Sequence, residues 1–314
     1  MRPLITRRTL IQVILLLVGL ILLGYFIVTS GIIENHQLLT TVNISLLGVA
    51  FILSLGNILV KVYRWKYLSA CYSQPISWKE ASLVSISSLF FANITPGKIG
   101  DLYKAYFMKM RYGLNFLDGV SMIFYERFFE LSILFVVATG IAFTQLQGIT
   151  VIILEITFLL LIVGIFLYYK VDTFLRIVQK VLVKLPLPLQ NEGLDLYIRK
   201  IPLFDILVVC LITLVSLVLE FIRLWVVVIA FGYLLNPFLI SIYMSLAIII
   251  GLVSQIPLGI GAMEGSLNHF ITSMGVPSAV ALAIVLVDRM ISMYFALVLG
   301  LIFSKFSFDA LQEV

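Results

Sequence analysis

Runs of apolar residues, each close to the length that spans a lipid bilayer, recur along the whole chain. A helix needs about 20 apolar residues to cross the hydrocarbon core of a membrane. Six runs approach or exceed that length: residues 10–30, 42–62, 118–146, 149–169, 203–233 and 277–304. Hydrophobic residues make up 62% of the 314 residues and charged residues only 12%, which excludes a soluble globular protein. We therefore predict an all-α, polytopic membrane protein with about six spans.

The first of these runs follows an arginine pair, Arg7-Arg8, as in a twin-arginine export signal. Its apolar part, residues 10–28, has the length of a membrane span and not of the shorter core of a cleaved signal. We expect a retained first helix.

Two further apolar stretches, residues 82–110 and 238–275, are interrupted near the middle by related motifs. The first motif is Asn-Ile-Thr-Pro-Gly-Lys-Ile-Gly-Asp at 93–101, and the second is Gln-Ile-Pro-Leu-Gly-Ile-Gly-Ala-Met-Glu at 255–264. In both, an Ile-Gly pair follows the proline by three and four residues. Proline removes a backbone donor and disfavours helix before it, and glycine permits turns. Each stretch is therefore predicted to contain a helix break.

Charged residues recur at matching distances from the two breaks. Glu126-Arg127 begins 26 residues after Gly100, and Asp288-Arg289 begins 27 residues after Gly261. On the other side, Arg64 lies 32 residues before Pro96, and Arg223 lies 34 before Pro257. This spacing predicts two copies of one unit, about 42–146 and 203–304, inside a single transmembrane domain that covers 1–314.

The distribution of lysine and arginine predicts how the units are oriented, because cytoplasmic flanks are enriched in both. Both flanks of 82–110 are basic, so this stretch is expected to be a hairpin that enters and leaves by the inner face; a single kinked helix is the alternative. The flanking bases are Lys61, Arg64, Lys66 and Lys79 before it, and Lys109 and Arg111 after it. No lysine or arginine lies between Leu224 and Asp288, so the second hairpin should open outward. The units would then form an inverted repeat, as in many transporters.

The same rule places both termini in the cytoplasm and the protein in the cell (inner) membrane. It also makes 171–202 a cytoplasmic linker. In that linker, Arg176, Lys180 and Lys184 recur every four residues, which suits either a helix lying on the inner membrane surface or a solvated linker helix.

The first break has the chemistry of an anion site. A half-helix that begins near Gly100 would direct free N–H groups at the break, and Lys98 adds a positive charge. A lipid phosphate would suit such a site. The second break lacks a lysine and offers Gln255, Glu264 and backbone amides. The alternative is that both motifs only kink packed helices.

Charges within the apolar stretches cost at least ~2.5–3.5 kcal/mol each at the membrane centre, so they indicate either a substrate path or ion pairs that fix helix register. We expect Glu126 and Glu130 to share a helix face, and Asp288 and Arg289 to find partners on other helices. Glu220 and Arg223 are three residues apart and can pair within one helix. The predicted substrate-binding residues are Asn93, Thr95, Pro96, Gly97, Lys98, Gly100, Asp101, Glu126, Arg127, Glu130, Glu220, Arg223, Gln255, Pro257, Gly259, Gly261, Glu264, Asp288 and Arg289.

These motifs resemble the lysylphosphatidylglycerol synthase transmembrane region, the flippase-like domain of the multiple-peptide-resistance-factor proteins. The resemblance covers about residues 10–305. It rests on the Pro-Gly-Lys-Ile-Gly-Asp run, the Pro-x-Gly-Ile-Gly-x-x-Glu run and the two acidic-Arg helices. It implies movement of a phospholipid or polyprenyl-linked lipid between leaflets. The tail after Lys305 is too short for the soluble aminoacyl-transferase domain of the resistance factors, so lysyl transfer is not expected.

We therefore expect a lipid flippase, with membrane lipids as its partners and without cofactor, metal or nucleic acid. Its cavity would hold an anionic headgroup near Lys98 and Arg127 and pass it to Arg289 or Arg223. One alternative is a membrane enzyme acting on a lipid-linked substrate, with Asp101 or Glu126 as base. Another is an accessory subunit of a lipid-modifying enzyme. The sequence leaves homo-oligomerisation open.

Overall fold

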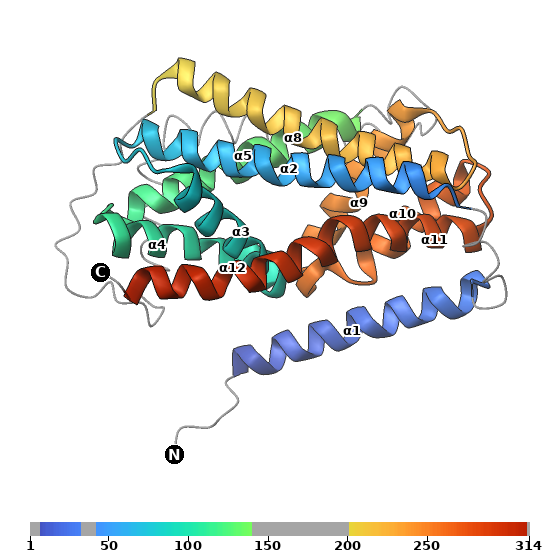
Figure 1. Ribbon diagram of the computed structural model, residues 1–314. Helices are drawn as coiled ribbons and strands as arrows, with labels where there is room; N and C mark the ends of the chain where they lie inside the picture. The colour runs from blue at the N-terminus through green and yellow to red at the C-terminus, as the bar shows by residue number, and fades with distance from the viewer. Residues whose placement is uncertain (1–6, 33–41, 140–200, 313–314) are drawn as a thin grey trace.

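The computed structural model describes residues 7–32, 42–139 and 201–312, and within these ranges all regular structure is helical (Figure 1). The predicted span 149–169, the linker 171–202 and the end of the span 118–146 lie outside the described residues. The helices are α1 (Arg7–Ser30), α2 (Ile44–Cys71), α3 (Trp78–Ile94), α4 (Leu102–Tyr112), α5 (Phe116–Ala138), α8 (Leu203–Ala230), α9 (Pro237–Val253), α10 (Ala262–Ser273), α11 (Ser278–Arg289) and α12 (Phe295–Gln312).

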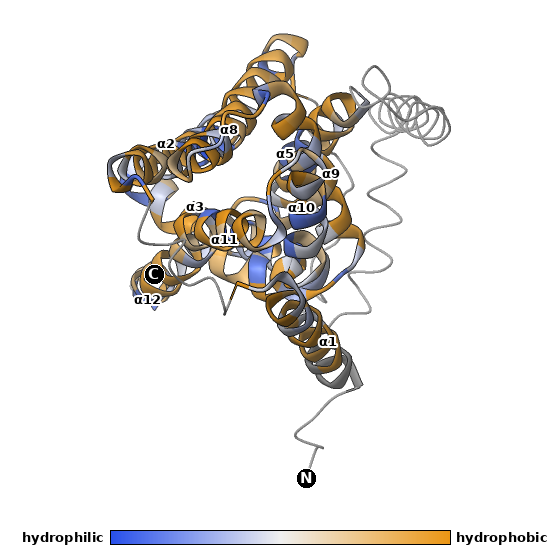
Figure 2. Ribbon diagram, turned by 90° about the vertical axis from the view of Figure 1, so that its right-hand side faces the viewer, coloured by the Kyte–Doolittle hydropathy of each residue, from blue (hydrophilic) through white to orange (hydrophobic). Residues whose placement is uncertain are grey.

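The outer faces of these helices are apolar. In the described part of the chain, three helical segments are long and apolar enough to cross a membrane: α2, α8 and the continuous helical stretch Ser278–Gln312. On α8, the exposed side chains include Phe204, Leu207 and Leu211, whereas Thr213 and Arg223 are buried. Hydrophobic colour accordingly dominates the outer helices in Figure 2. A polar interior with an apolar exterior is the arrangement of a membrane protein.

Helices α2 and α8 lie side by side and antiparallel in Figure 1. At one end, the N–H of Asn43 donates to the carbonyl of Ala230 at 2.9 Å. Toward the other end, the Tyr67 hydroxyl donates to Asp205 Oδ1 at 2.6 Å. The predicted span 42–62 was too short, since α2 continues to Cys71.

The predicted break in the first interrupted stretch is confirmed. Between α3 and α4 lies a 3₁₀ segment, η2 (Pro96–Asp101), in which Gly97 and Lys98 have left-handed backbones with φ of 61° and 57°. The chain then folds back so tightly that a Cβ atom at Gly100 would lie 2.0 Å from the carbonyl oxygen of Phe91. Only glycine fits at Gly100.

The second break has the same character. Between α9 and α10 lies η4 (Pro257–Gly259), where Leu258 has φ of 64° and Gly259 has φ of 65°. The two breaks meet, because a Cβ atom at Gly97 would lie 2.7 Å from Oε1 of Gln255. In each break, the two residues that follow the proline therefore have left-handed backbones, and the two breaks pack against each other.

The last predicted span, 277–304, is not a regular α-helix. A π-helical segment, Met290–Tyr294, separates α11 from α12 directly after Asp288 and Arg289. The Ser54 hydroxyl donates to the carbonyl of Ile291 within this segment at 3.1 Å. Such π segments carry an extra residue per turn and are frequent at functional sites.

Candidate functional site

A cavity of about 340 Å³ lies where the two breaks meet. Its volume is in the range of ligand sites in proteins. Predicted site residues that line it are Asn93, Thr95, Gly97, Lys98, Asp101, Arg127, Glu130, Glu220, Arg223, Gln255, Gly259, Asp288 and Arg289. Those outside its lining are Pro96, Gly100, Glu126, Pro257, Gly261 and Glu264. Most of the residues selected from sequence therefore surround one space.

Arg127 on α5 holds the first break. Its Nε donates to Asp101 Oδ2 at 2.8 Å, and a second guanidinium nitrogen contacts the same oxygen. Its third nitrogen donates to Glu130 Oε2 at 2.6 Å. Because Asp101 is the last residue of η2, this charge-assisted contact ties the break to α5.

Arg289 on α11 holds the second break in the same way. Its Nε donates to Glu264 Oε1 at 2.8 Å, and its guanidinium also donates to the carbonyl of Leu258 at 2.5 Å. The other oxygen of Glu264 accepts the N–H of Gly261 at 2.7 Å. The arginine follows its acidic partner by 25 residues here and by 26 in the first unit.

The acidic residue of each acidic-Arg pair reaches a different helix. Glu126 accepts from Arg64 Nε of α2 at 3.0 Å, and Asp288 accepts from Arg223 Nε of α8 at 2.8 Å. These pairs are 62 and 65 residues apart in sequence. Glu126 has a second cationic partner, since Lys104 Nζ lies 2.7 Å from Glu126 Oε2.

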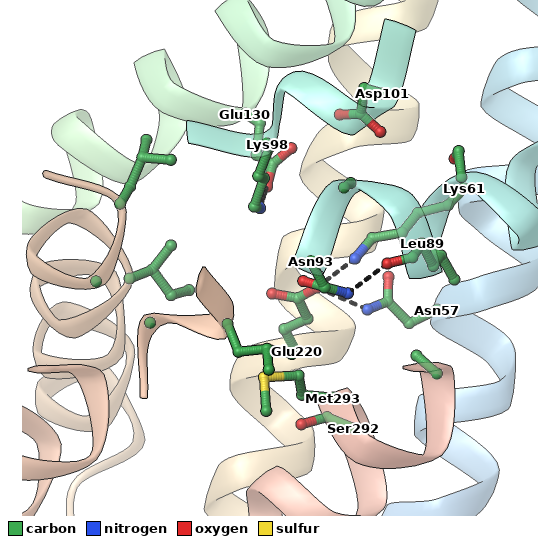
Figure 3. A pocket seen from close by; sticks show the side chains of 18 of the residues that line it. Asn57, Lys61, Leu89, Asn93, Lys98, Asp101, Glu130, Glu220, Ser292 and Met293 are labelled. Atoms are coloured by element: carbon green, nitrogen blue, oxygen red, sulfur yellow. Dashed lines mark hydrogen bonds and ion pairs between the residues drawn. The ribbon is translucent and has the colours of Figure 1, made fainter. Parts of the chain in front are cut away.

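Equivalent positions of α2 and α8 also contact each other directly. Lys61 lies three residues before Arg64, and Glu220 lies three before Arg223; Lys61 Nζ and Glu220 Oε1 are 2.7 Å apart. Likewise, the Ser216 hydroxyl donates to Asn57 Oδ1 at 2.5 Å, and each lies seven residues before its arginine. Figure 3 shows Lys61 and Asn57 both directed at Glu220. The two units therefore match in their contacts as well as in their spacing.

Three sequence interpretations were wrong in detail. Glu220 and Arg223 do not pair within α8, because each reaches a closer partner on another helix, Lys61 and Asp288 respectively. The Gly100 N–H is not free, because it donates to the Thr95 hydroxyl at 2.7 Å. The Glu264 carboxylate is likewise occupied, by Arg289 and Gly261. The expectation that Asp288 and Arg289 find partners on other helices is confirmed.

Eight polar residues that line the cavity were not predicted: the serines Ser54, Ser85, Ser88 and Ser292, and the larger Asn57, Lys61, Arg64 and Lys104. Lys61 and Arg64 had been interpreted as cytoplasmic flank charges, but Arg64 is only 4% exposed and Lys61 lines the cavity. Their positions three residues apart, which Glu220 and Arg223 repeat, were the available signal. No sequence signal identified Lys104, since no charged residue of the second unit corresponds to it.

The contact between Lys61 and Glu220 gives a first prediction. Reversing either charge alone, by Lys61→Glu or Glu220→Lys, places like charges in contact and should lower the free energy of unfolding by about 1–2 kcal/mol, given partial exposure. The double variant restores an opposite pair and should recover most of this loss. The midpoints of thermal unfolding of the three variants in detergent test this prediction. If the double variant loses as much stability as the two single variants together, the pairing is contradicted.

Comparison with known proteins shows which family the chain belongs to. The family model of the lysylphosphatidylglycerol synthase TM region matches residues 11–300. A UPF0104 membrane protein of Methanothermobacter thermautotrophicus is 29% identical over 283 residues, which are 83% of each chain. Another, of Methanocaldococcus jannaschii, is 22% identical over 95% of this chain and 94% of its own. The chain is a helical membrane protein that belongs to the lysylphosphatidylglycerol synthase TM region family.

Proposed function

We propose that this protein moves a lipid between the two leaflets of the membrane, with the headgroup passing through the charged cavity while the acyl or prenyl chains stay in lipid. The observation that carries the proposal is the position of the cavity: it lies where two interrupted helical stretches meet, inside a bundle whose outer surface is apolar. Charged side chains that line a cavity at such a place often mark the path of a polar substrate.

The matched contacts support an inverted repeat as the architecture of this path. Helices α2 and α8 are antiparallel and meet through equivalent residues, as a twofold axis in the membrane plane would require. In transporters built this way, the substrate binds between the halves, near breaks in the helices. Rocking of one unit against the other would open the cavity to each leaflet in turn.

Blocking the cavity without changing a charge tests the path. Ser292 lines the cavity, and its hydroxyl donates only locally, to the carbonyl of Asp288. Ser292→Trp should fill much of the space and reduce transport of a fluorescent lipid across proteoliposome bilayers at least tenfold. The measurement is the fraction of labelled lipid that a membrane-impermeant quencher reaches over time.

Two matched variants serve as controls. Leu301→Trp introduces the same indole on the exposed face of α12 and should transport like the unmodified protein. Ser292→Ala removes the hydroxyl without filling the space and should also remain active. Equal transport by folded Ser292→Trp protein, as judged by size-exclusion profile, would contradict a path through this cavity.

A further inference from the structure

The charges of the site balance except beside Glu126, which meets two cations. Arg64 Nε lies 3.0 Å from Glu126 Oε1, and Lys104 Nζ lies 2.7 Å from Glu126 Oε2. Arg64, Lys104 and Glu126 are 4%, 5% and 1% exposed. The other ion pairs of the described residues match cations with equal numbers of carboxylates: Arg223 with Asp288, Arg289 with Glu264, Lys61 with Glu220, and Arg127 and Lys98 with Asp101 and Glu130. The Glu126 cluster therefore holds one excess positive charge, which is costly in a membrane interior.

The second unit lacks this extra cation. The residue eight positions after the proline of the break is Lys104 in the first unit and Gly265 in the second. A Cβ atom at Gly265 would lie 2.1 Å from Cε2 of Phe26, so an apolar ring of α1 fills the space next to that position. In the described part of the second unit, one arginine and one carboxylate, Arg223 and Asp288, make the matching helix contact. A lysine is therefore not needed to hold the helices together.

Of the three side chains in the cluster, Lys104 is the one whose charge can change. An arginine keeps its proton in proteins, and a carboxylate that faces two cations stays ionised. A buried lysine can give up its proton, and the neutral amine that remains can still donate a hydrogen bond to Glu126. Loss of this proton would leave Arg64 and Glu126 as a neutral pair, as Arg223 and Asp288 are in the second unit.

A bound anion would also neutralise the cluster, but the surroundings of both cations disfavour it. Lys104 Nζ lies over the ring of Trp65, 4.8 Å from the ring centroid, and Trp65 is fully buried. The face of an aromatic ring attracts cations and repels anions. Arg64 Nη1 donates to the buried hydroxyl of Thr213 at 3.1 Å. A proton fits this enclosed cluster better than an anion does.

Other charged groups on the elements around α4 have partners of their own. The part of α3 from Ala81 to Ile94 contains no charged residue, and Lys305 and Asp309 of α12 are exposed. The remaining charges on α2, η2 and α5 that have a described partner are Lys61 with Glu220, Lys66 over the Trp78 ring, Lys98 with Glu130, and Arg127 with Asp101. Asp118 lies eight residues before Glu126, about 12 Å along α5. Arg64 and Glu126 therefore dominate the electrostatic environment of the Lys104 ammonium group.

The same cluster joins the first break to the second unit. Arg64 belongs to α2, which packs along α8, and its second hydrogen bond goes to Thr213 of α8. Lys104 and Glu126 belong to α4 and α5, which pack so closely that a Cβ atom at Gly119 would lie 2.7 Å from Cα of Ala105. Glu126 thus connects the α4–α5 pair to the α2–α8 pair through Arg64 alone.

Resting on the lipid transport proposed above, we infer that Lys104 binds and releases one proton in each transport cycle. With the proton bound, Lys104 repels Arg64 and shares Glu126 with it, so the contact between α2 and α5 is weakened. When the proton leaves, Glu126 pairs with Arg64 as its single cation and the contact tightens. The proton passes through the cavity, which Lys104 lines, to the aqueous phase on the open side. A pH gradient would then drive lipid movement.

Proteoliposomes with a pH gradient test this coupling. Vesicles of phosphatidylcholine carry a trace of acyl-labelled phosphatidylglycerol, the membrane potential is clamped with potassium and valinomycin, and a membrane-impermeant quencher reports the leaflet ratio of the label. One proton per lipid can support a ratio of up to about tenfold for each pH unit. We expect a ratio of about threefold or more with the unmodified protein, measured against protein-free vesicles. Rapid equilibration to a ratio that ignores the gradient would overturn the inference and retain the proposed function.

Variants at Lys104 separate proton exchange from a structural role. Lys104→Met is never charged and Lys104→Arg is always charged, so both should lose the response to the gradient. Lys104→His can titrate and should restore part of the response at lower pH. Lys305→Met, on an exposed position of α12, is the matched control and should respond like the unmodified protein. Size-exclusion profiles select folded variants; a full response in Lys104→Arg would show a structural cation and overturn the inference.

Two further measurements assign the outcome. Exchange of chloride for gluconate should leave the ratio unchanged, whereas a ratio that follows a chloride gradient would assign the cluster to an anion and overturn the inference. A pH-sensitive dye inside the vesicles records proton entry directly. Proton entry that Lys104→Met abolishes, without any movement of the labelled lipid, would retain the proton site and reject the proposed function.

Discussion

Replacing Glu126 with glutamine is expected to lower the free energy of unfolding by about 3–5 kcal/mol, the largest effect of any single change considered for this chain. The Glu126 carboxylate is only 1% exposed and pairs with both Arg64 and Lys104, which are buried themselves. Glutamine is nearly the same size, so the loss would come from leaving two cations unpaired in the membrane interior. The thermal midpoint of purified protein in detergent, together with the yield of monodisperse protein, measures it.

A second substitution identifies the cause. Adding Lys104→Met to Glu126→Gln removes one of the stranded cations and should recover part of the lost stability, whereas Lys104→Met alone should be milder than Glu126→Gln. Glu80→Gln is the matched control, because Glu80 accepts from Ser77 in an exposed capping box and glutamine can still cap. If Glu126→Gln proves as mild as Glu80→Gln, the buried ion pairs do not stabilise the fold as described.

The second large effect is expected at the first helix break. Gly100→Ala would place a methyl group 2.0 Å from the carbonyl oxygen of Phe91 and 2.8 Å from the N of Ala92, both backbone atoms that cannot move aside on their own. The hairpin between α3 and α4 would have to open, and we expect a loss of about 3 kcal/mol or more in the free energy of unfolding. The midpoint of thermal unfolding in detergent reports this loss.

Gly48→Ala provides a control of opposite sign. Gly48 lies within α2, and a Cβ atom there would meet nothing within 4 Å. Alanine at such a helical position should stabilise the protein by about 0.5–1 kcal/mol. If Gly100→Ala and Gly48→Ala shift the midpoint equally, η2 does not approach α3 as closely as described.

The two helix breaks could be located from sequence because their cause is local. A proline followed by glycines inside an apolar stretch acts on its own residues, through a missing N–H and an accessible left-handed backbone. Pro96 and Pro257 accordingly mark the breaks in the structure. The π-helical segment after Arg289 has no comparable signal, since Met290–Tyr294 contains neither proline nor glycine.

The pairing of charges could be predicted only in part, because it depends on which helices meet. The spacing within α8 favoured an ion pair between Glu220 and Arg223. Instead, α2 packs against α8 and places Lys61 in contact with Glu220. The charge rule for membrane flanks assigned Arg64 to the cytoplasm because the hydropathy boundary fell at residue 62, whereas α2 continues to Cys71. The repeated spacing of Arg64 and Arg223 was the better guide, since it reflects a contact that both units make.

The pairing of Lys61 with Glu220 bears on how such a protein could have arisen. Two identical ancestral chains meeting across this helix interface would have set lysine against lysine, or glutamate against glutamate, and repelled each other. In a single chain each unit can change alone, so opposite charges are available at the shared position. The Lys61–Glu220 ion pair therefore depends on the two units differing at this position.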